Sequence, residues 1–501
     1  MMKGKRHIAL LIPAFALTLH ASEKDSAIVE HIGAWQQVNA QQRMNPALQG
    51  VAFTTSYSQL SAEVDYRKQT EAFVLEKGEG FFLTQASVNT YLRLSDRTAV
   101  WGHASYMDGK QRNVTWNSTS DFDLLRPYVL GDTLGGDTHR ERYQFSGGYA
   151  TQLNRWHVGA EMLFRAEHEY RDVDPRMRGI VNDLTLRLGG GHEALEYQWG
   201  LALEANVYKQ TNDVDFYHEL GVIPEYQLTG LGTVYGRFSS DKRTLYYQGG
   251  GVRILLDANP MDENGFYGHA EWQENRYHRV LAELNSLPLT DLYKQGVKAT
   301  MGWKRAGEKN WAVYASFAFD KHSGDERIIG TSASSAYPVM GRRTMYKEDL
   351  MDASLNGIYG KNGDANWHVT AKMGYGKDSE RYVYPERRLS VSYLYGGLGG
   401  EVFFNPTGKM LLTCNVDAVC QGNLTHDILM PFADMDEAFT QKVNHQYDYQ
   451  KAHYASVSGS VRADYQVSGR YGIYAAVGGG GIFCSSQGHQ LAARLSVGLT
   501  F

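Results

Sequence analysis

The strongest constraint on the fold is an alternation of apolar and polar residues with a period of two, clearest at the end of the chain. The last residues read LAARLSVGLTF, in which Leu491, Leu495, Leu499 and Phe501 share one parity and Arg494 falls on the other. Successive side chains of a strand point to opposite faces, so the pattern predicts a strand with one apolar face. A strand of about 9–11 residues that ends on an aromatic residue is typical of an outer-membrane crossing. The alternative is the half-buried last strand of a soluble sandwich.

The same alternation recurs along most of the chain, which favours the membrane interpretation. So many long strands with one pattern are hard to fit into a soluble core. Several of them begin with a tryptophan on the apolar parity, directly after a short turn, where an interfacial aromatic girdle would lie. The clearest stretches are 156–164, 195–207, 311–319, 367–375 and 410–418.

The connections between the strands alternate in length, as short turns and long loops do at the two ends of an outer-membrane barrel. Short links are expected at 95–97, 154, 189–193, 239–243, 306–310, 361–366, 405–409 and 468–470. Long segments are expected at 69–80, 108–140, 170–178, 209–229, 258–290, 321–346, 377–387, 419–450 and 481–488.

These connections predict an all-β fold, a transmembrane antiparallel up-and-down β-barrel. They give about nine hairpins, or roughly 18 strands, with both ends of the barrel on the short-turn side. The interval 258–290 is ambiguous, because residues 264–272 could cross the membrane or extend a hairpin above it. Barrels of about 14 or 16 strands therefore remain alternatives.

The start of the chain predicts export. A basic region at 3–6, an apolar run at 8–19 and a cleavage site after Ala21 indicate a signal peptide at 1–21. Residues 22–50 have apolar side chains at helical spacing and predict a short helix, in the periplasm or in the barrel lumen. Residues 51–501 form the barrel. An exported chain with 55 acidic and 50 basic residues is a poor candidate for nucleic-acid binding.

Charged residues on the second parity are expected to face the lumen. A lysine or arginine that faces lipid near the midplane costs about 2–4 kcal/mol. The lumen is therefore predicted to be polar, and at this width it holds either a water channel or a plug. The expected lumen residues are Glu161, Arg165, Glu167, Glu196, Glu204, Lys372, Asp417 and Arg494.

One long loop, residues 113–137, has the composition of an inward-folding constriction, because it combines acidic, basic and aromatic side chains. An ordinary soluble loop is the alternative. Its candidate residues are Trp116, Asp121, Asp123, Arg126, Tyr128 and Asp132.

The cysteines and motifs give little further chemistry. Export permits a disulfide, and the expected topology brings Cys420 and Cys484 near one rim; the alternative is that both are unpaired. The chain has no nucleophile elbow, zinc-protease motif or phosphate-binding loop. We therefore expect no enzyme, no cofactor and no metal, although a barrel-embedded hydrolase stays open.

The signal peptide, Asn45-Pro46-Ala47, the array of alternating strands and the terminal Leu499-Thr500-Phe501 together resemble an outer-membrane barrel family of Bacteroidota-type bacteria, described as a domain of unknown function. The Asn-Pro-Ala segment is also similar to the N-terminal regions of fatty-acid-transporter-like and gliding-associated barrels. The TonB-dependent receptors are a poorer match, because this chain lacks room for their separate plug domain. The resemblance implies location and architecture, in the outer membrane of a Gram-negative bacterium, and no ligand.

Three functions follow as hypotheses. The first is a passive or accessory transport channel for small polar solutes. The second is a plugged structural or partner-binding barrel that docks a surface lipoprotein or a secretion component, and the third is the hydrolase. The expected partners are outer-membrane lipid and the outer-membrane assembly machinery, which would contact the C-terminal Phe501.

Overall fold

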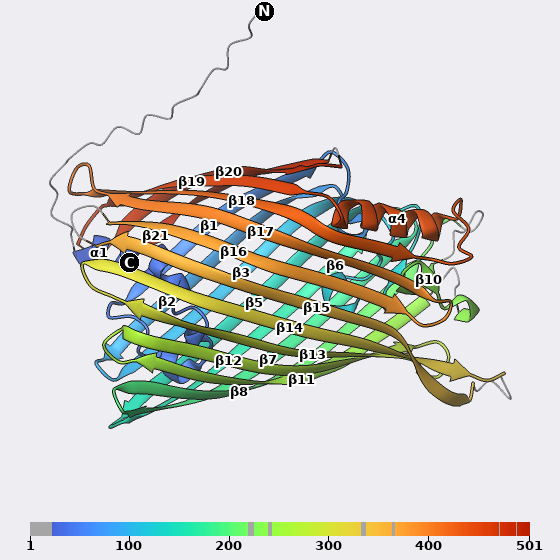
Figure 1. Cartoon of the computed structure of the whole chain (residues 1–501), viewed down its shortest axis with the longest axis horizontal. Helices are drawn as coiled ribbons and strands as arrows, with labels where there is room; N and C mark the ends of the chain where they lie inside the picture. Colours follow the sequence, from blue (N-terminus) through green and yellow to red (C-terminus); the bar gives the residue numbers. More distant parts are fainter. Residues whose placement is uncertain are drawn as a thin grey trace, which may run out of the picture.

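The computed structural model describes residues 23–218, 225–238, 243–331, 337–362, 366–469, 471–486 and 488–501. The expected signal peptide lies outside the described residues. In the described part, 18 antiparallel strands form one sheet that closes on itself, because β1 pairs with β21 as well as with β2 (Figure 1). The predicted antiparallel barrel of 18 strands is confirmed.

The barrel strands follow one another around the wall in sequence order. They are β1 Tyr57–Gln69, β2 Gly80–Ser95, β3 Thr98–Val114, β5 Gly136–Leu153, β6 Trp156–Arg171, β7 Arg176–Ala194, β8 Tyr197–Asp215, β11 Arg243–Pro260, β12 Asn264–Leu281 and β13 Leu287–Arg305. The remainder are β14 Lys309–Ile329, β15 Val339–Lys361, β16 Asn366–Tyr382, β17 Arg387–Phe404, β18 Met410–Leu429, β19 Tyr454–Gln466, β20 Gly472–Cys484 and β21 His489–Thr500.

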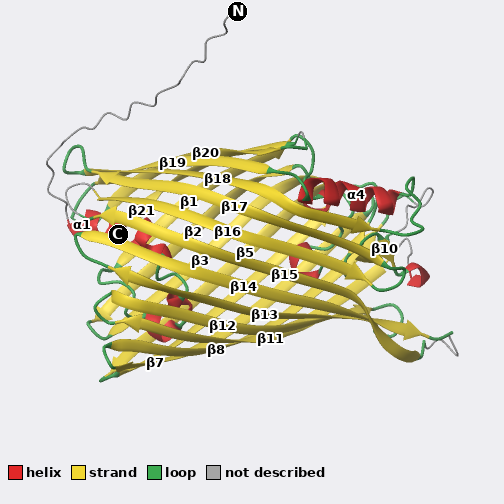
Figure 2. Cartoon of the chain, in the orientation of Figure 1, coloured by secondary structure: helices red, strands yellow, loops and turns green. Residues whose placement is uncertain are grey.

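The helices lie at the two ends of the barrel (Figure 2). At the short-turn end, on the left of the view, are α1 Glu23–Ile32, η1 Ala34–Gln37, η2 Gln42–Met44 and α2 Pro46–Gln49. Four further helices lie within the long loops: η3 Leu75–Lys77, α3 Phe122–Leu125, η4 Gly236–Phe238 and α4 Ala438–Gln450. None of the described helices is both long enough and apolar enough to cross a membrane.

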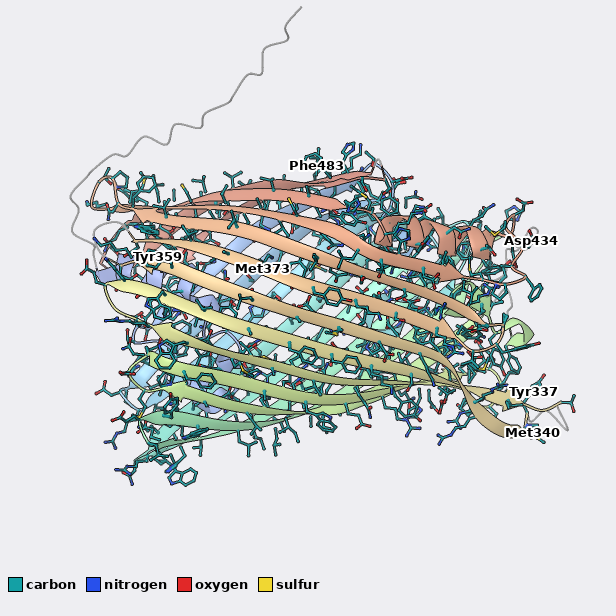
Figure 3. All side chains as sticks on the ribbon, in the orientation of Figure 1. Tyr337, Met340, Tyr359, Met373, Asp434 and Phe483 are labelled. Carbon is teal, nitrogen blue, oxygen red and sulfur yellow. The ribbon has the colours of Figure 1, made fainter. Side chains whose placement is uncertain are left out.

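The outer face carries the apolar parity of the strands. Leu495 and Val497 of β21 are 55% and 48% exposed, and Tyr359 and Met373 point away from the barrel (Figure 3). On β16 this apolar row ends at Lys377, the first outward-facing charge toward the long-loop end. Asp349 ends the row on β15 in the same way. Strand residues beyond these positions therefore stand above the membrane-spanning segments.

The strand count is right, but two of the expected connections are wrong. Residues 258–290 are not a loop, because β11 and β12 meet at a tight turn, Met261–Glu263, and both are barrel strands. The short turn expected at 239–243 lies largely outside the described residues. The preceding stretch, 226–234, forms β9 and β10 of an inner sheet with β4, not a barrel strand. An alternating pattern does not indicate which sheet a strand joins. The expected count included residues 226–234 and left out β12, so the total of 18 barrel strands is still right.

Residues 23–56, the N-terminal segment, pack inside the short-turn end of the barrel. Ile28 contacts Phe403 and Leu411 of β17 and β18, whereas Val38 contacts Tyr267 of β12. Phe53 packs against side chains of β2 and β3. The segment thus touches several sides of the wall and occupies the lumen, not the open periplasm.

Polar contacts fix the N-terminal segment to the wall. The Lys304 ammonium donates to Asn39 at 2.8 Å, and Glu401 accepts a hydrogen bond from the backbone N–H of Ala34 at 2.6 Å. Asn45 caps α2 by accepting from the Ala47 N–H at 3.0 Å. A Cβ added to Gly189 would lie 2.1 Å from the Asn45 side chain, so this glycine permits the close approach of α2 to β7.

Gly189→Val should displace α2 and reduce stability by about 1–3 kcal/mol, because the added side chain overlaps the N-terminal segment. The expected result is faster protease cleavage of residues 26–56 and a lower unfolding temperature of the refolded barrel. Gly190→Val is the matched control, since a Cβ there meets no atom closer than 4.0 Å. Equal behaviour of the two variants would contradict the close packing.

Candidate functional site

An ion-pair network runs along the lumen side of the adjacent strands β6, β7, β8, β11 and β12. Arg187 of β7 contacts Glu161 of β6 at 2.7 Å and Glu204 of β8 at 2.5 Å. Arg253 of β11 continues the network, 3.6 Å from Glu204 and 3.3 Å from Glu271. The expected lumen residues Glu161 and Glu204 therefore face inward, but they are paired with neighbours along β6 to β12.

The other expected lumen residues lie in different surroundings. Lys372 and Asp417 line a cavity of about 110 Å³ between the N-terminal segment and β14 to β18. Arg494 pairs with Asp65 at 2.8 Å. The prediction that Glu196 lines the lumen is wrong. This residue lies in the exposed turn that follows β7, with a φ of 63°. The strand ends before Glu196 because a tight hairpin turn needs positive φ there.

Residues 115–135, the transverse loop, fold into the lumen and are anchored on β6. Asp121 accepts two hydrogen bonds from the guanidinium of Arg165, at 2.8 and 2.7 Å. Arg165 also lies 3.4 Å from Glu167, which is buried. Asp132 pairs with Arg171 at 2.7 Å, and both side chains are fully buried. Bidentate, charge-assisted contacts of this kind fix the orientation of a loop.

The far end of the transverse loop reaches the opposite wall. Arg126 contacts Glu348 of β15 at 2.7 Å and Glu380 of β16 at 3.3 Å. In the strand order, β15 and β16 lie across the barrel from β6. The loop is therefore a strut across the lumen, held by ion pairs at both ends.

The remaining loop candidates complete the strut. Trp116 is buried against Phe439 of α4, with ring centroids 5.2 Å apart. Tyr128 is buried, and its ring centroid lies 5.4 Å from the guanidinium carbon of Arg279. Asp123 is exposed and pairs with Lys77 at 2.7 Å. Leu130 pairs with Gln227 of the inner sheet, so a second inward segment braces the loop.

Three carboxylates form an acidic pocket where Arg126 ends: Glu348, Asp378 and Glu380. Their oxygens all lie within 4.8 Å of one another. Glu348 and Glu380 are directly opposite in the β15–β16 register, an arrangement in which like charges repel. Burial, with repulsion from Glu348, raises the pKa of Asp378 to about 7 and that of Glu380 to about 8. Burial opposes the charge of Glu348 too, but His322 and Arg126 lower its pKa to about 2.

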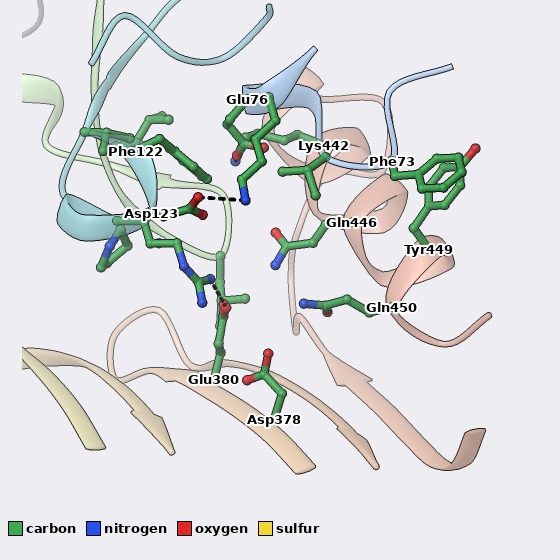
Figure 4. Close-up of a pocket in the computed structure, with 18 of the residues that line it drawn as sticks. Phe73, Glu76, Phe122, Asp123, Asp378, Glu380, Lys442, Gln446, Tyr449 and Gln450 are labelled. Carbon is green, nitrogen blue, oxygen red and sulfur yellow. Dashed lines mark hydrogen bonds and ion pairs between the residues drawn. The ribbon is translucent and has the colours of Figure 1, made fainter. Parts of the chain in front are cut away.

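The acidic pocket opens into a cavity of about 580 Å³ between the strut, α4 and the strands β15 to β20 (Figure 4). Asp378 and Glu380 form its floor, and Gln446 and Gln450 of α4 approach from one side. Lys442 of α4 also lines it, paired with Glu76 at 2.5 Å. The cavity offers charged, amide and aromatic groups to a solute.

This cavity continues along the wall that the ion-pair network leaves unfilled. A second cavity, about 360 Å³, shares Asp378, Gln421, Gln450 and Tyr454 with it. The small cavity beside Lys372 and Asp417 shares Val419 with the first and ends at Gln37 and Val38 of the N-terminal segment. The three cavities span the lumen from the long-loop end to the N-terminal segment.

The possible Cys420–Cys484 disulfide is not formed in this structure, which has the alternative arrangement of two free cysteines. Cys420 of β18 lies opposite Ala455, whereas Cys484 of β20 lies opposite Tyr454. The two cysteines are thus separated by β19 and, because adjacent residues of β19 face opposite ways, they point to opposite faces. A disulfide needs Cα atoms closer than about 7 Å.

Sequence reasoning identified Arg126 but missed its partners in the acidic pocket. Asp378 and Glu380 do alternate on the inward parity of β16, which was a usable signal. Glu348 gives no such signal, because only the register places it opposite Glu380. The helix α4 was also missed, within a segment expected to be a loop.

The raised pKa values of Asp378 and Glu380 predict a stability that falls as pH rises. Between about pH 4 and pH 8 the folded protein holds more protons on these groups than the unfolded chain does, so unfolding is favoured by higher pH. The unfolding temperature of the refolded barrel should decrease over about pH 5 to pH 8, and less steeply for Asp378→Asn. The matched control is Asp427→Asn, at an exposed rim position. Identical slopes for native protein and Asp378→Asn would contradict the raised pKa.

Among solved structures, the chain matches several proteins at very low identity and low TM-score. BauA, the ferric preacinetobactin receptor from Acinetobacter baumannii, is 9% identical with a TM-score of 0.41; the match covers 89% of this chain and 81% of BauA. A mutant of PfeA, the ferric enterobactin receptor from Pseudomonas aeruginosa, is 7% identical with a TM-score of 0.38, over 89% and 80% of the two chains. The copper transporter OprC is 8% identical with a TM-score of 0.40, over 89% and 81%.

No curated protein matches the chain. One family model covers all of the barrel strands together with the capped helix α2. That model, of the family of unknown function DUF6850, matches residues 46–501, and the chain belongs to this family.

Proposed function

We propose that the protein is a gated transport barrel of the outer membrane, which admits a small polar solute at the long-loop end and releases it at the short-turn end. The observation that carries this proposal is the row of three adjoining cavities along β14 to β20. A barrel of this width is too wide for wall side chains alone to fill. Here ion pairs connect the inward side chains of β6 to β12, whereas cavities remain along β14 to β20.

Gating is part of the proposal because the chain itself obstructs the row of cavities twice. The strut ends at the acidic pocket beside the first cavity, and the N-terminal segment lies below the last one. The N-terminal segment is held by hydrogen bonds together with small apolar clusters, and the strut by ion pairs together with a larger apolar cluster that includes Tyr128 and Leu130. The ion pairs and hydrogen bonds can exchange with water or solute when the obstructions open.

Conductance of the refolded protein in planar bilayers tests the proposal. The native barrel should show rare, small openings. Arg126→Ala, which releases the far end of the strut, and deletion of residues 26–49 should each open it partly. Their combination should give stable openings several-fold larger, because the two obstructions act in series.

The control for that experiment is Arg305→Ala, which removes an exposed arginine at the opposite end of the barrel. Heat-modifiable migration establishes that each variant is folded. A double variant that inserts as a folded barrel and stays silent would defeat the transport proposal.

A second candidate function is a plugged barrel that docks a surface lipoprotein or secretion component, and exposed apolar side chains at the long-loop rim favour it. Phe432 is fully exposed, Tyr384 is 73% exposed, and Met340 at the tip of the β14–β15 hairpin is 71% exposed. Isolated exposed residues need no partner, but several on one rim fit an interaction surface. Loss of a stoichiometric co-purifying partner in Met340→Ser and Phe432→Ser would support this function.

A further inference from the structure

The acidic pocket already holds a cation. The guanidinium of Arg126 contacts Glu348 through one terminal nitrogen and Glu380 through the other. Both carboxylates are almost completely buried, at 0% and 4% exposure. Arg126 is delivered by the transverse loop and not by the wall, so this cation can leave without disturbing any barrel strand.

Arg126 neutralises only part of the pocket. Asp378 forms no ion pair within the described residues, and its Oδ1 is buried without a hydrogen-bond partner. The nearby cations are used elsewhere: Lys294 of β13 donates to the Asp123 carbonyl at 3.2 Å, and Lys442 of α4 pairs with Glu76. His322 of β14 forms a hydrogen bond with Oε2 of Glu348, the oxygen that Arg126 does not contact. The pocket therefore has more acceptor oxygens, and more carboxyl groups that can ionise, than Arg126 satisfies.

The unsatisfied side of the pocket faces the large cavity. Asp378 and Glu380 line that cavity, and Figure 4 shows both carboxylates pointing into it beneath the strut. Among the described charged residues that line this cavity, Asp378 is the one without an ion pair. Charge-assisted bonds from such buried carboxylates are strong only toward a cationic partner.

We propose that the acidic pocket is the recognition site for a guanidinium or amine group of the transported solute, and that Arg126 occupies it as an internal ligand in the closed barrel. This inference rests on the proposed transport function. A cationic solute competes with Arg126, releases the far end of the strut and thereby opens the passage. Solutes without a positive charge leave the strut in place.

Competition has a distinctive consequence for affinity. A site that is mostly filled by an internal ligand binds an external one weakly, in proportion to the fraction of time it is vacant. Removal of Arg126 must therefore strengthen the binding of a cationic probe. Burial and acidic neighbours raise the pKa of Glu380, so in Arg126→Ala, where the pocket has lost its internal cation, binding of a cationic probe should release protons near neutral pH.

Calorimetric titration of the full-length refolded barrel in detergent with ethylguanidinium tests the site, with ethylurea as the neutral probe of the same shape. Native protein should bind ethylguanidinium weakly. Arg126→Ala should bind it at least about tenfold more tightly, and Arg126→Lys by an intermediate factor. Adding Glu380→Gln or Asp378→Asn to Arg126→Ala should remove that gain. Ethylurea should bind none of these proteins.

The controls are Arg388→Ala and Asp427→Asn, which break an exposed ion pair at the rim and should not change the titration. Unchanged or weaker binding in folded Arg126→Ala, or equal binding of ethylurea, would overturn the inference. Because binding in detergent needs no conduction, a barrel that binds ethylguanidinium but stays silent in bilayers would defeat the transport proposal alone. An open barrel that does not distinguish the two probes would defeat the recognition site alone.

Discussion

Closure of the backbone hydrogen-bond ladder is the constraint on which the rest of the structure depends. In hydrocarbon an unpaired N–H or C=O has no water to bond, so a strand can cross only if both of its edges are paired. The β1–β21 pairing satisfies the last two edges and joins the beginning of the barrel to its end. Every later feature, including which residues can reach across the lumen, follows from this ring of strands and its order.

Closure at this width creates an interior that the wall cannot fill. The chain fills it unevenly. Along β6 to β12, arginines and glutamates of neighbouring strands pair with one another, and each charge that could not face lipid is neutralised by its neighbour. Along β14 to β20, cavities remain, and two other elements of the chain cover them: the N-terminal segment at one end and the strut at the other.

The strut shows how one loop can couple two sides of a barrel. Its near end is fixed by the buried Asp132–Arg171 pair and by the bidentate Asp121–Arg165 contact, which is expensive to break. Its far end is held by Arg126, in a pocket with an excess of carboxyl groups, and by Tyr128, which packs beside Tyr346 of β15. The Arg126 ion pairs adjoin the large cavity, whereas the Asp132–Arg171 pair is fully buried, so Arg126 is the end of the strut that a solute in the cavity can reach.

The sequence by itself determined the fold class. The parity of Leu495, Val497 and Leu499, repeated from strand to strand, specifies which face meets lipid, because side chains of a strand alternate whatever lies beside it. Loop composition also indicated that Asp121, Arg126 and Asp132 belong together.

Tertiary structure alone decided their partners. Glu348 lies opposite Glu380 only through the β15–β16 register, and Arg126 reaches them only because β6 and β15 face each other across a closed ring. The same holds for residues 226–234, whose alternation fitted a barrel strand but which pair with the transverse loop inside the lumen. Alternation is a local property of one strand, whereas register, ring order and the choice of sheet depend on residues far apart in the chain, and these set the site.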